Sequence, residues 1–298
     1  MLAIVIPYYK LTFFEQTLQS LCDQTDKRFT VYIGNDASPE NPATLIKKFK
    51  KSVTIVYRTF ETNLGSTSLV KQWDRCIKMV EAEEWIMVLG DDDVLGENVV
   101  EEFYKNLAEI ENIGSSVIRY STRVINENNI NISQIYKHPK LETGTDFLIR
   151  KFKGGTRSSL SEYIFRKVKI ETIKFKDLPL AWYSDLLSVV EFAEFKNIYT
   201  INEALLKFRL SGINITSKTD NLRLKNRATF SFYYYLLNQH GKTFPTELVQ
   251  IIFNNLERTL LDNKKQIVGW IKLCYLYSLF FQWRRIISLS LKIKASIR

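Results

Sequence analysis

Residues 85–93, WIMVLGDDD, join a short apolar run directly to three consecutive carboxylates. An unbroken apolar run of this length is typical of a strand covered on both faces of a parallel sheet. Three adjacent carboxylates repel one another unless a cation or solvent neutralises their charge. The stretch therefore predicts a buried strand that ends in an acidic loop, with Asp91, Asp92 and Asp93 at its carboxyl end.

Strands and helices alternate on the N-terminal side of this run. Strand and helix in turn are predicted at residues 2–7, 12–22, 29–33, 43–50, 53–57 and 68–80. Such alternation implies right-handed crossovers and a mostly parallel sheet, which binds its ligands at the carboxyl ends of the strands. The predicted fold class is α/β: a Rossmann-like, mostly parallel sheet flanked by helices.

On the C-terminal side this pattern weakens and then gives way to helices. A helix and a strand are predicted at 97–110 and 116–124, and helices alone at 222–239, 245–261 and 266–298. We therefore expect an α/β domain at 1–218 and a helical, basic C-terminal region at 219–298.

The formal charge of +10 is concentrated near the C-terminus. From residue 263 onward no residue is acidic, and the basic residues are Lys264, Lys265, Lys272, Arg284, Arg285, Lys292, Lys294 and Arg298. A groove that binds nucleic acid would need positive charge spread along it. We therefore expect no nucleic-acid partner. The 45% of hydrophobic residues is enough for a sizeable core.

The apolar stretch at 273–283 raises the question of a membrane. It is shorter than the roughly 20 residues that span a bilayer, and Arg284 and Arg285 follow it. Its aromatic and basic composition is typical of a helix that lies on a membrane surface. The alternative is a helix that packs on its neighbours and keeps a solvated basic face. Peripheral contact at the inner face of the cell membrane is therefore an expectation.

The cysteines and histidines do not form a recognisable site. Cys22, Cys76 and Cys274 are far apart and lack histidines at ligand spacing, so neither a disulfide framework nor a zinc site is expected. His138 and His240 have no partner for a nucleophile triad. The N-terminus shows no signal-peptide pattern, which predicts a cytoplasmic location.

The acidic loop has the composition of a divalent-metal site. Hard cations such as Mg²⁺ prefer oxygen ligands, and often take one or two carboxylates while substrate phosphates and water complete their shell. Asp36 follows the second predicted strand and should face the same crevice. Its carboxylate could accept hydrogen bonds from a base or ribose there. Alternatively, Asn35 and Asp36 could simply stabilise a turn before Pro39.

Four motifs together resemble one enzyme family. They are Ile4-Val5-Ile6-Pro7-Tyr8-Tyr9, Asn35-Asp36-Ala37-Ser38, Asn63-Leu64-Gly65 and Leu89-Gly90-Asp91-Asp92-Asp93. Their order and spacing over about the first 120 residues resemble the family 2 glycosyltransferases of the GT-A fold, especially bacterial members that build surface polysaccharides. The resemblance implies inverting sugar transfer from a nucleotide-sugar donor, expected to be a UDP-sugar, to a hydroxyl of a glycan or lipid-linked glycan. It also implies a divalent metal, Mg²⁺ or Mn²⁺, as cofactor.

The resemblance assigns the nucleotide pocket position by position. Asp36 matches the acidic residue that contacts the nucleotide base, and Pro7 and Tyr8 match the segment that lines this pocket. The expected donor site also includes Asn63, Gly65 and Asp91.

The metal motif of the family is commonly Asp-x-Asp, and its register here is open. Gly90 stands where the most frequent form of the motif has its first Asp. Aligned on the apolar residues that follow, Asp92 is the candidate metal ligand, with Asp93 as its neighbour. Asp91 paired with Asp93 is the other register.

Inversion also needs a base that removes a proton from the attacking hydroxyl. In the family this base is an Asp or Glu at the start of a helix beyond the metal motif. Residues 181–186, AWYSDL, are similar to that segment, which makes Asp185 the expected base. Helix capping by Ser184 or Asp185, worth about 1 kcal/mol, is the alternative, and both roles can hold.

Two further loops attract attention. Residues 208–216, FRLSGINIT, resemble the flexible segment that closes over the donor diphosphate in related enzymes, and the planar donors of Arg209 match phosphate oxygens. An ordinary surface arginine is the alternative. Residues 154–159, GGTRSS, could form a mobile acceptor-side loop, but they lack the lysine and the strand–turn–helix context of a P-loop.

Two other functions fit parts of the pattern. Nucleotidyl transfer also uses carboxylates, a metal and an α/β sheet, but it usually needs a glycine-rich, basic signature near the first strand, and residues 5–10, VIPYYK, contain no glycine. A nucleotide- or membrane-binding module without catalysis is the second alternative, and its binding would depend on the basic tail.

Overall fold

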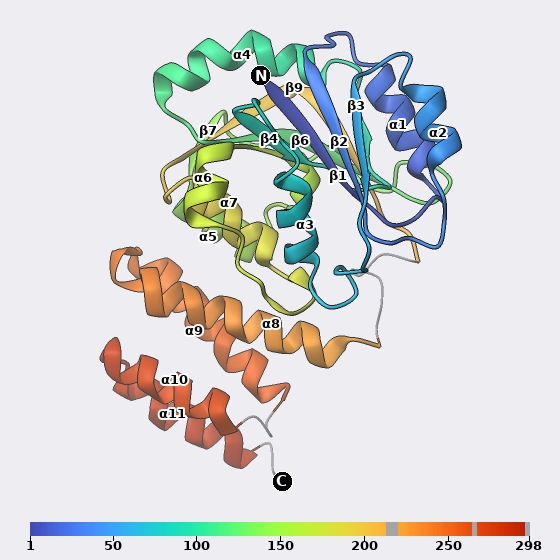
Figure 1. Cartoon of the computed structure of the whole chain (residues 1–298). Helices are drawn as coiled ribbons and strands as arrows, with labels where there is room; N and C mark the ends of the chain where they lie inside the picture. The colour runs from blue at the N-terminus through green and yellow to red at the C-terminus, as the bar shows by residue number, and fades with distance from the viewer. Residues whose placement is uncertain (213–219, 264–266, 296–298) are drawn as a thin grey trace. The chain divides into compact units, whose positions relative to one another are not determined.

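The structure, a computed structural model, describes residues 1–212, 220–263 and 267–295, with side chains up to residue 289 (Figure 1). The chain divides into two compact units. The first comprises Met1–Asp177 and Ser184–Thr219, and the second comprises Leu178–Tyr183 and Asp220–Arg298. The short segment 178–183 therefore belongs with the C-terminal helices. The division predicted at 218/219 places this segment in the first domain instead.

Within the described residues, the first unit is built on one nine-stranded sheet. Its strands are β1 (Leu2–Tyr8), β2 (Phe29–Asn35), β3 (Ile55–Thr59), β4 (Trp85–Val88), β5 (Val94–Leu95), β6 (Val117–Ile125), β7 (Leu141–Thr143), β8 (Tyr163–Arg166) and β9 (Asn197–Arg209). Their order is β3-β2-β1-β4-β8-β6-β9-β5, with β7 paired to β9. The strands from β3 to β4 run parallel, as predicted, but β8 is antiparallel to both β4 and β6. The sheet is thus parallel in its N-terminal half and mixed in the other.

Helices connect and cover these strands (Figure 1). They are α1 (Phe14–Cys22), α2 (Ala43–Phe49), α3 (Leu69–Ile77), α4 (Val99–Ile113), α5 (Gly144–Phe152), α6 (Lys167–Ile173) and α7 (Ser184–Phe192). The first three join β1 to β4 in the β-α-β order that the sequence predicts. The predicted α/β class is therefore confirmed, with helices flanking one central sheet.

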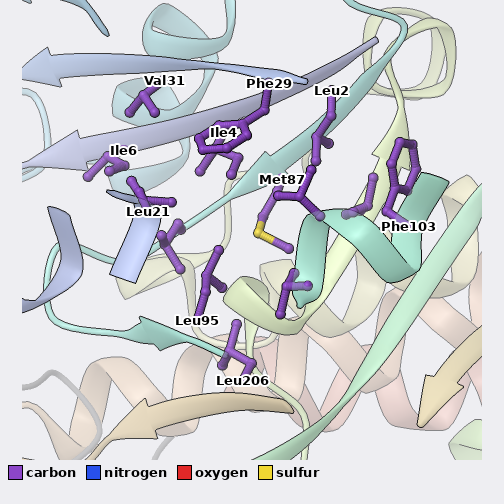
Figure 2. Packing of buried hydrophobic residues seen from close by; sticks show 14 of the residues in the cluster. Leu2, Ile4, Ile6, Leu21, Phe29, Val31, Met87, Leu95, Phe103 and Leu206 are labelled. Carbon is purple, nitrogen blue, oxygen red and sulfur yellow. The ribbon is translucent and has the colours of Figure 1, made fainter. Parts of the chain in front are cut away.

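Strand β1 shows why the runs predicted to be parallel strands are apolar throughout and do not alternate with polar residues. Leu2, Ile4 and Ile6 enter a core shared with α1, α2 and α4, part of which Figure 2 shows. Ala3 and Val5 point to the opposite face, and all five side chains are fully buried. Because both faces of the strand are covered, a polar residue on either face would lose its contact with water.

The described part of the second unit is helical. Its helices are α8 (Leu222–Tyr235), α9 (Thr246–Leu261), α10 (Ile267–Leu279) and α11 (Trp283–Ala295). The single helix predicted at 266–298 is wrong, because Phe281 adopts a positive φ of 54° and separates α10 from α11. The ring of Tyr183 stacks on Phe232 of α8 with centroids 4.6 Å apart, which ties the segment 178–183 to this unit. None of the helices in the described ranges is long and apolar enough to cross a bilayer.

Candidate active site

The carboxyl ends of β1, β2 and β4 meet at one edge of the sheet. Tyr8 at the end of β1 pairs in register with Asn35 at the end of β2, and Val5 of β1 pairs with Val88 at the end of β4. Because these strands are parallel, the residues that follow each of them leave the sheet at this same edge. Asp36 and the acidic loop after β4 therefore lie on the same side, as the sequence predicts.

Asp91 ties the exit of β4 to the exit of β1. Its Oδ2 accepts hydrogen bonds from the backbone N–H groups of Tyr9 and Lys10, each at 2.8 Å. Burial raises the pKa of the Asp91 carboxyl to about 6, and the neighbouring charge of Asp92 adds to the rise. A contact of Asp91 with the donor stays a prediction, but its carboxylate already has a role in shaping this edge.

Asp93 anchors two segments that are distant in the sequence. It is 2% exposed, and it accepts hydrogen bonds from the Ser161 hydroxyl at 2.5 Å and from the Arg209 backbone N–H at 2.8 Å. The Ser161 hydroxyl in turn accepts from the Gly90 N–H at 3.0 Å. Burial raises the pKa of the Asp93 carboxyl to about 7, and the charge of Asp92 raises it further. The acidic loop is therefore held from both sides.

Gly90 lies close to the carboxylates of both Asp92 and Asp93. A Cβ atom at this position would lie 3.1 Å from Asp92 Oδ1 and 3.1 Å from Asp93 Oδ2. A side chain at residue 90 would therefore crowd both oxygens, which favours glycine in place of the usual first Asp of the motif.

The acidic loop suits a hard divalent cation. Its donors are carboxylate oxygens, and Asp92 and Asp93 each place one of them close to Gly90. Among the described residues, no group of three or more His, Cys, Asp or Glu side chains could hold a metal ion. A pair of carboxylates is nevertheless what Mg²⁺ commonly takes when substrate phosphates and water fill its other positions. The register with Asp92 and Asp93 as ligands therefore fits, and metal binding itself stays a prediction.

Asp36 holds the loop that contains Asn63 and Gly65. Its two carboxylate oxygens accept hydrogen bonds from the N–H groups of Leu64 at 2.7 Å and Gly65 at 2.8 Å. A Cβ at residue 65 would lie only 2.5 Å from Asp36 Oδ2, so this approach requires glycine. Asn63 Oδ1 accepts from the Ser66 N–H at 2.9 Å, which closes the turn. These contacts bring together residues of two of the motifs.

Arg75 of α3 is a residue of this region that sequence reasoning missed. Its guanidinium forms an ion pair with the Asp36 carboxylate. It also donates to the Thr62 carbonyl at 2.7 Å and lies over the Phe60 ring at 4.0 Å. An arginine in the last turn of an amphipathic helix gives no local signal of this role, because only the folding of α3 against β2 brings it to Asp36.

Tyr8, the last residue of β1, packs at the same edge of the sheet. Its side chain is fully buried, and its hydroxyl donates to the Glu40 carbonyl at 2.9 Å. Its ring packs against Phe14 with centroids 4.6 Å apart, and burial raises the pKa of its hydroxyl to about 12. Pro7 precedes it and is partly exposed. Their predicted contact with the nucleotide base is untested, but both lie at the predicted edge.

Asp185 lies in the first turn of α7, at the start of a helix as the sequence predicts, and is partly exposed. Burial raises the pKa of its carboxyl, and hydrogen bonding from the Leu186 N–H opposes the rise, as do the charges of Lys151 and Arg157. The bond from Leu186 is the capping contact that we considered as an alternative, so capping and catalysis compete for the same carboxylate without excluding each other. The charge of Arg157 also lowers the pKa of Asp93, so both carboxylates lie within range of one cation.

Arg209 is buried and hydrogen-bonded to three other segments of the protein. Its side chain is fully buried at the end of β9 and lies over the Phe13 ring at 4.4 Å. Its guanidinium donates to the Asp92 carbonyl at 2.8 Å, the Asn126 carbonyl at 3.0 Å and Gln16 Oε1 at 2.7 Å. In this structure Arg209 therefore holds the acidic loop, so the alternative of an ordinary surface arginine is wrong, whereas its contact with the donor diphosphate stays a prediction. Residues 213–216 of the segment predicted to close over the donor lie outside the described residues.

These features define a nucleotide-binding α/β domain of the GT-A type, and the comparisons identify its family. A family model of glycosyl transferase family 2 matches residues 3–168, more than half of the chain. The chain belongs to glycosyl transferase family 2. Its function is therefore transfer of a sugar from a nucleotide sugar, and neither nucleotidyl transfer nor binding without catalysis describes the family.

Solved structures of one bacterial protein are similar to this chain. Residues 1–349 of S. aureus TarS in complex with UDP-GlcNAc align with a TM-score of 0.65 and 17% identity, covering 94% of this chain and 80% of that one. The same TarS segment in complex with UDP aligns with a TM-score of 0.63 and 17% identity, covering 89% and 73%. At this level of identity the likeness shows the shared fold. No curated protein matches the sequence.

Proposed function

We propose that this chain transfers a sugar, with inversion and with a divalent metal, from a UDP-sugar to a hydroxyl of a glycan or lipid-linked glycan. The observation that carries the proposal is the acidic loop after β4, where Asp92 Oδ1 and Asp93 Oδ2 both approach Gly90. The crystallisation of TarS with UDP and with UDP-GlcNAc supports the choice of donor.

In this proposal Asp92, with Asp93 beside it, holds Mg²⁺ or Mn²⁺. The metal, when bound, would neutralise the charge that develops on the leaving diphosphate, an effect worth several kcal/mol. The chain's own part is to keep the two carboxylates in place. Hydrogen bonds from Ser161 and Arg209 hold the Asp93 carboxylate, and the Arg209 guanidinium holds the Asp92 backbone carbonyl, without any contribution from the metal.

Asp185 is the proposed base. It would accept the proton of the acceptor hydroxyl as the oxygen attacks the anomeric carbon, while the bond from that carbon to the diphosphate oxygen breaks. A carboxylate whose pKa is raised by burial is a better proton acceptor near neutral pH than an ordinary aspartate. The partly exposed position of Asp185 leaves it accessible to an acceptor.

The nucleotide would occupy the edge formed by Pro7, Tyr8, Asp36 and the loop with Asn63 and Gly65. Asp36 already accepts two backbone hydrogen bonds and pairs with Arg75. A carboxylate has about four acceptor positions, so one remains for a base N–H. The Asp36–Arg75 pair also fixes the loop in place before the nucleotide arrives.

Helices α10 and α11 support a proposal of peripheral contact with an anionic membrane, at its inner face. Exposed apolar side chains lie on both helices: Ile267, Val268, Ile271 and Tyr275 on α10, and Trp283 and Ile287 on α11. We call these six residues the apolar face. Arg284 and Lys272 are exposed on the same helices, and the sequence from residue 263 onward has no acidic residue. Apolar burial combined with attraction between basic residues and anionic lipid is the usual basis of interfacial binding.

The proposed donor site is tested by thermal unfolding of the full chain with a panel of nucleoside diphosphates and nucleotide sugars, with and without Mn²⁺. A ligand that binds only the folded state raises the melting temperature by mass action. We expect UDP and UDP-sugars to stabilise the wild type in a metal-dependent manner, and Asp92→Asn to lose the metal-dependent part. Folded wild-type protein that none of these ligands stabilises would contradict the proposal.

A further inference from the structure

Arg157 is hydrogen-bonded to the turn that reaches the acidic loop, and the proposed function gives it no role. We propose that Arg157 is a positioning residue for sugar transfer, which fixes the turn that carries Ser161 to the acidic loop and supplies a permanent positive charge that acts on Asp185. This inference rests on the proposed function for the role of Asp185, but its geometry is independent of that role.

The guanidinium of Arg157 is fixed by three segments of the first unit. Its Nη1 donates to Thr122 Oγ1 of β6 at 3.2 Å and to Glu162 Oε2 at 2.9 Å. Its plane lies over the ring of Phe208 on β9, with the central carbon 4.3 Å from the ring centroid. Only 16% of the side chain is exposed. A planar group held by two hydrogen bonds and a stacked ring has little freedom to move.

Glu162 connects Arg157 to the turn that contacts the acidic loop. It is fully buried, and its Oε2 accepts from the Ser159 N–H at 3.2 Å and the Ser159 hydroxyl at 3.0 Å, which closes the 3₁₀ turn at Leu160–Glu162. Ser161, inside this turn, donates to Asp93. Arg157 therefore connects through Glu162 and the turn to Asp93, without touching Asp93 itself.

The charge of Arg157 reaches Asp185 as well. The charged and titratable groups that act on Asp185 from the first unit are Lys151 of α5, Arg157, and Tyr163 of β8, whose own pKa responds to the Asp185 charge. Lys151 has the larger effect of the two cations, but burial lowers the pKa of its own amine. An arginine keeps its charge at every pH that a protein tolerates. Arg157 is thus the constant part of the field at Asp185.

Two substitutions separate the geometry of Arg157 from its charge. Arg157→Gln removes both, so the pKa of Asp185 should rise and the acidic limb of the pH–rate profile should move to higher pH. We expect a shift of about half a unit or more, the size that loss of one nearby charge causes in partly screened surroundings. Arg157→Lys keeps the charge but loses the planar set of guanidinium donors. The acidic limb of the pH–rate profile should therefore stay in place while kcat falls at every pH.

The rate can be followed with UDP-GlcNAc and Mn²⁺ in the full chain, as release of UDP with water acting as the acceptor. Arg166→Gln is a matched control, because Arg166 also pairs with carboxylates, those of Glu84 and Glu111, and lies 4.4 Å over the ring of Trp85. It is not among the groups that most affect the pKa of Asp93 or of Asp185. The control should leave the pH profile unchanged.

A second measurement needs no turnover. In a double-mutant cycle with Asp185→Asn, the melting temperature should fall less on Arg157→Gln when residue 185 is already neutral, and this coupling should vanish at acid pH, where Asp185 is protonated. If the wild type neither binds nor cleaves the nucleotide sugar, the proposed function fails, and the cycle still decides whether Arg157 and Asp185 interact. If the wild type is active, an unshifted profile in Arg157→Gln together with additive melting temperatures would overturn the inference and leave the proposed function intact.

Discussion

At the scale of single residues, the glycine at position 65 has a specific steric reason. The Asp36 carboxylate accepts from both Leu64 and Gly65 N–H groups, and this places its Oδ2 where a Cβ of residue 65 would have to lie. The sequence motif Asn-Leu-Gly is therefore a consequence of the close approach between a loop backbone and a carboxylate.

Gly65→Ala should consequently destabilise the fold. The added Cβ would lie 2.5 Å from Asp36 Oδ2, so either the loop or the carboxylate has to move, at a cost of about 1–3 kcal/mol. Denaturant unfolding measures the loss. Gly212→Ala is the control, because a Cβ there meets nothing within 4 Å, and its effect should stay within about 0.5 kcal/mol. Equal stabilities of the two variants would contradict the steric explanation.

Arg209 offers a direct contrast between a bracing role and a ligand-binding role. Arg209→Ala would remove a buried guanidinium and leave the Asp92 and Asn126 carbonyls without these donors, so we expect a loss of about 2–4 kcal/mol in unfolding free energy. Lys207→Ala, at an exposed position of the same strand, should change little. A contact with the donor diphosphate predicts the reverse, namely unchanged stability with weakened UDP binding, and that result would favour the role that the resemblance implies.

His138 makes the stability of the first unit sensitive to acid. Burial, and then the charges of Arg119, Arg150 and Arg157, lower the pKa of its imidazole to about 2. Because the unfolded value is about 6.5, stability from the neutral imidazole is present above that pH and is lost as the pH falls toward the folded value, by about 2 kcal/mol between pH 7 and pH 5.

His138→Gln removes this titration and can still accept from Arg150, which lies 2.9 Å from His138 Nδ1. We therefore expect the variant to show a shallower loss of unfolding free energy than the wild type over this pH range. His240→Gln is the control for the loss of a histidine elsewhere in the chain. The same slope in all three proteins would mean that His138 is protonated when folded.

At the scale of elements, α10 divides its apolar residues between two faces. Leu273, Leu276 and Tyr277 are buried within the second unit, and the Tyr277 hydroxyl donates to Glu257 of α9 at 2.9 Å. The members of the apolar face on α10 lie on the opposite side and are exposed. The two alternatives drawn from the sequence, packing and membrane contact, therefore apply to different sides of one helix.

Vesicle binding tests the apolar face. The full chain should sediment with anionic vesicles at low salt and less with zwitterionic ones, because screening and loss of lipid charge both weaken the attraction. Ile271→Glu should reduce binding severalfold. Thr246→Glu adds the same charge at an exposed site on α9 and should have a smaller effect. Equal binding of both variants, or none by the wild type, would remove the membrane from the proposal.

The acidic loop illustrates how elements cooperate. It follows β4, but its carboxylates hold the exit of β1 through Asp91, and the turn before β8 and the end of β9 through Asp93. Segments from several strands are therefore held by hydrogen bonds to the carboxylates of this one loop. Such convergence explains why a loop with three adjacent carboxylates keeps a defined shape.

At the scale of the whole molecule, the sequence was sufficient for the parts of the chain whose pattern is local. The apolar runs of β1, β2 and β4, the helices between them and the placement of Asp36 and the acidic loop at one edge follow from periodicity and from the geometry of parallel strands. Four linked motifs then led to the family that the comparison confirms.

The tertiary structure decided what depends on contacts between distant segments. The antiparallel place of β8 between β4 and β6, the ion pair of Arg75 with Asp36, and the grouping of residues 178–183 with α8 leave no periodic trace in the sequence. Arg209 is the clearest case. Its position in a polar loop-like segment gives no sign of burial, but its side chain is fully buried once β9 pairs with β5 and β6. Local sequence determines which backbone conformation is favourable, whereas the burial and the partners of a charged side chain are set by segments that only folding brings together.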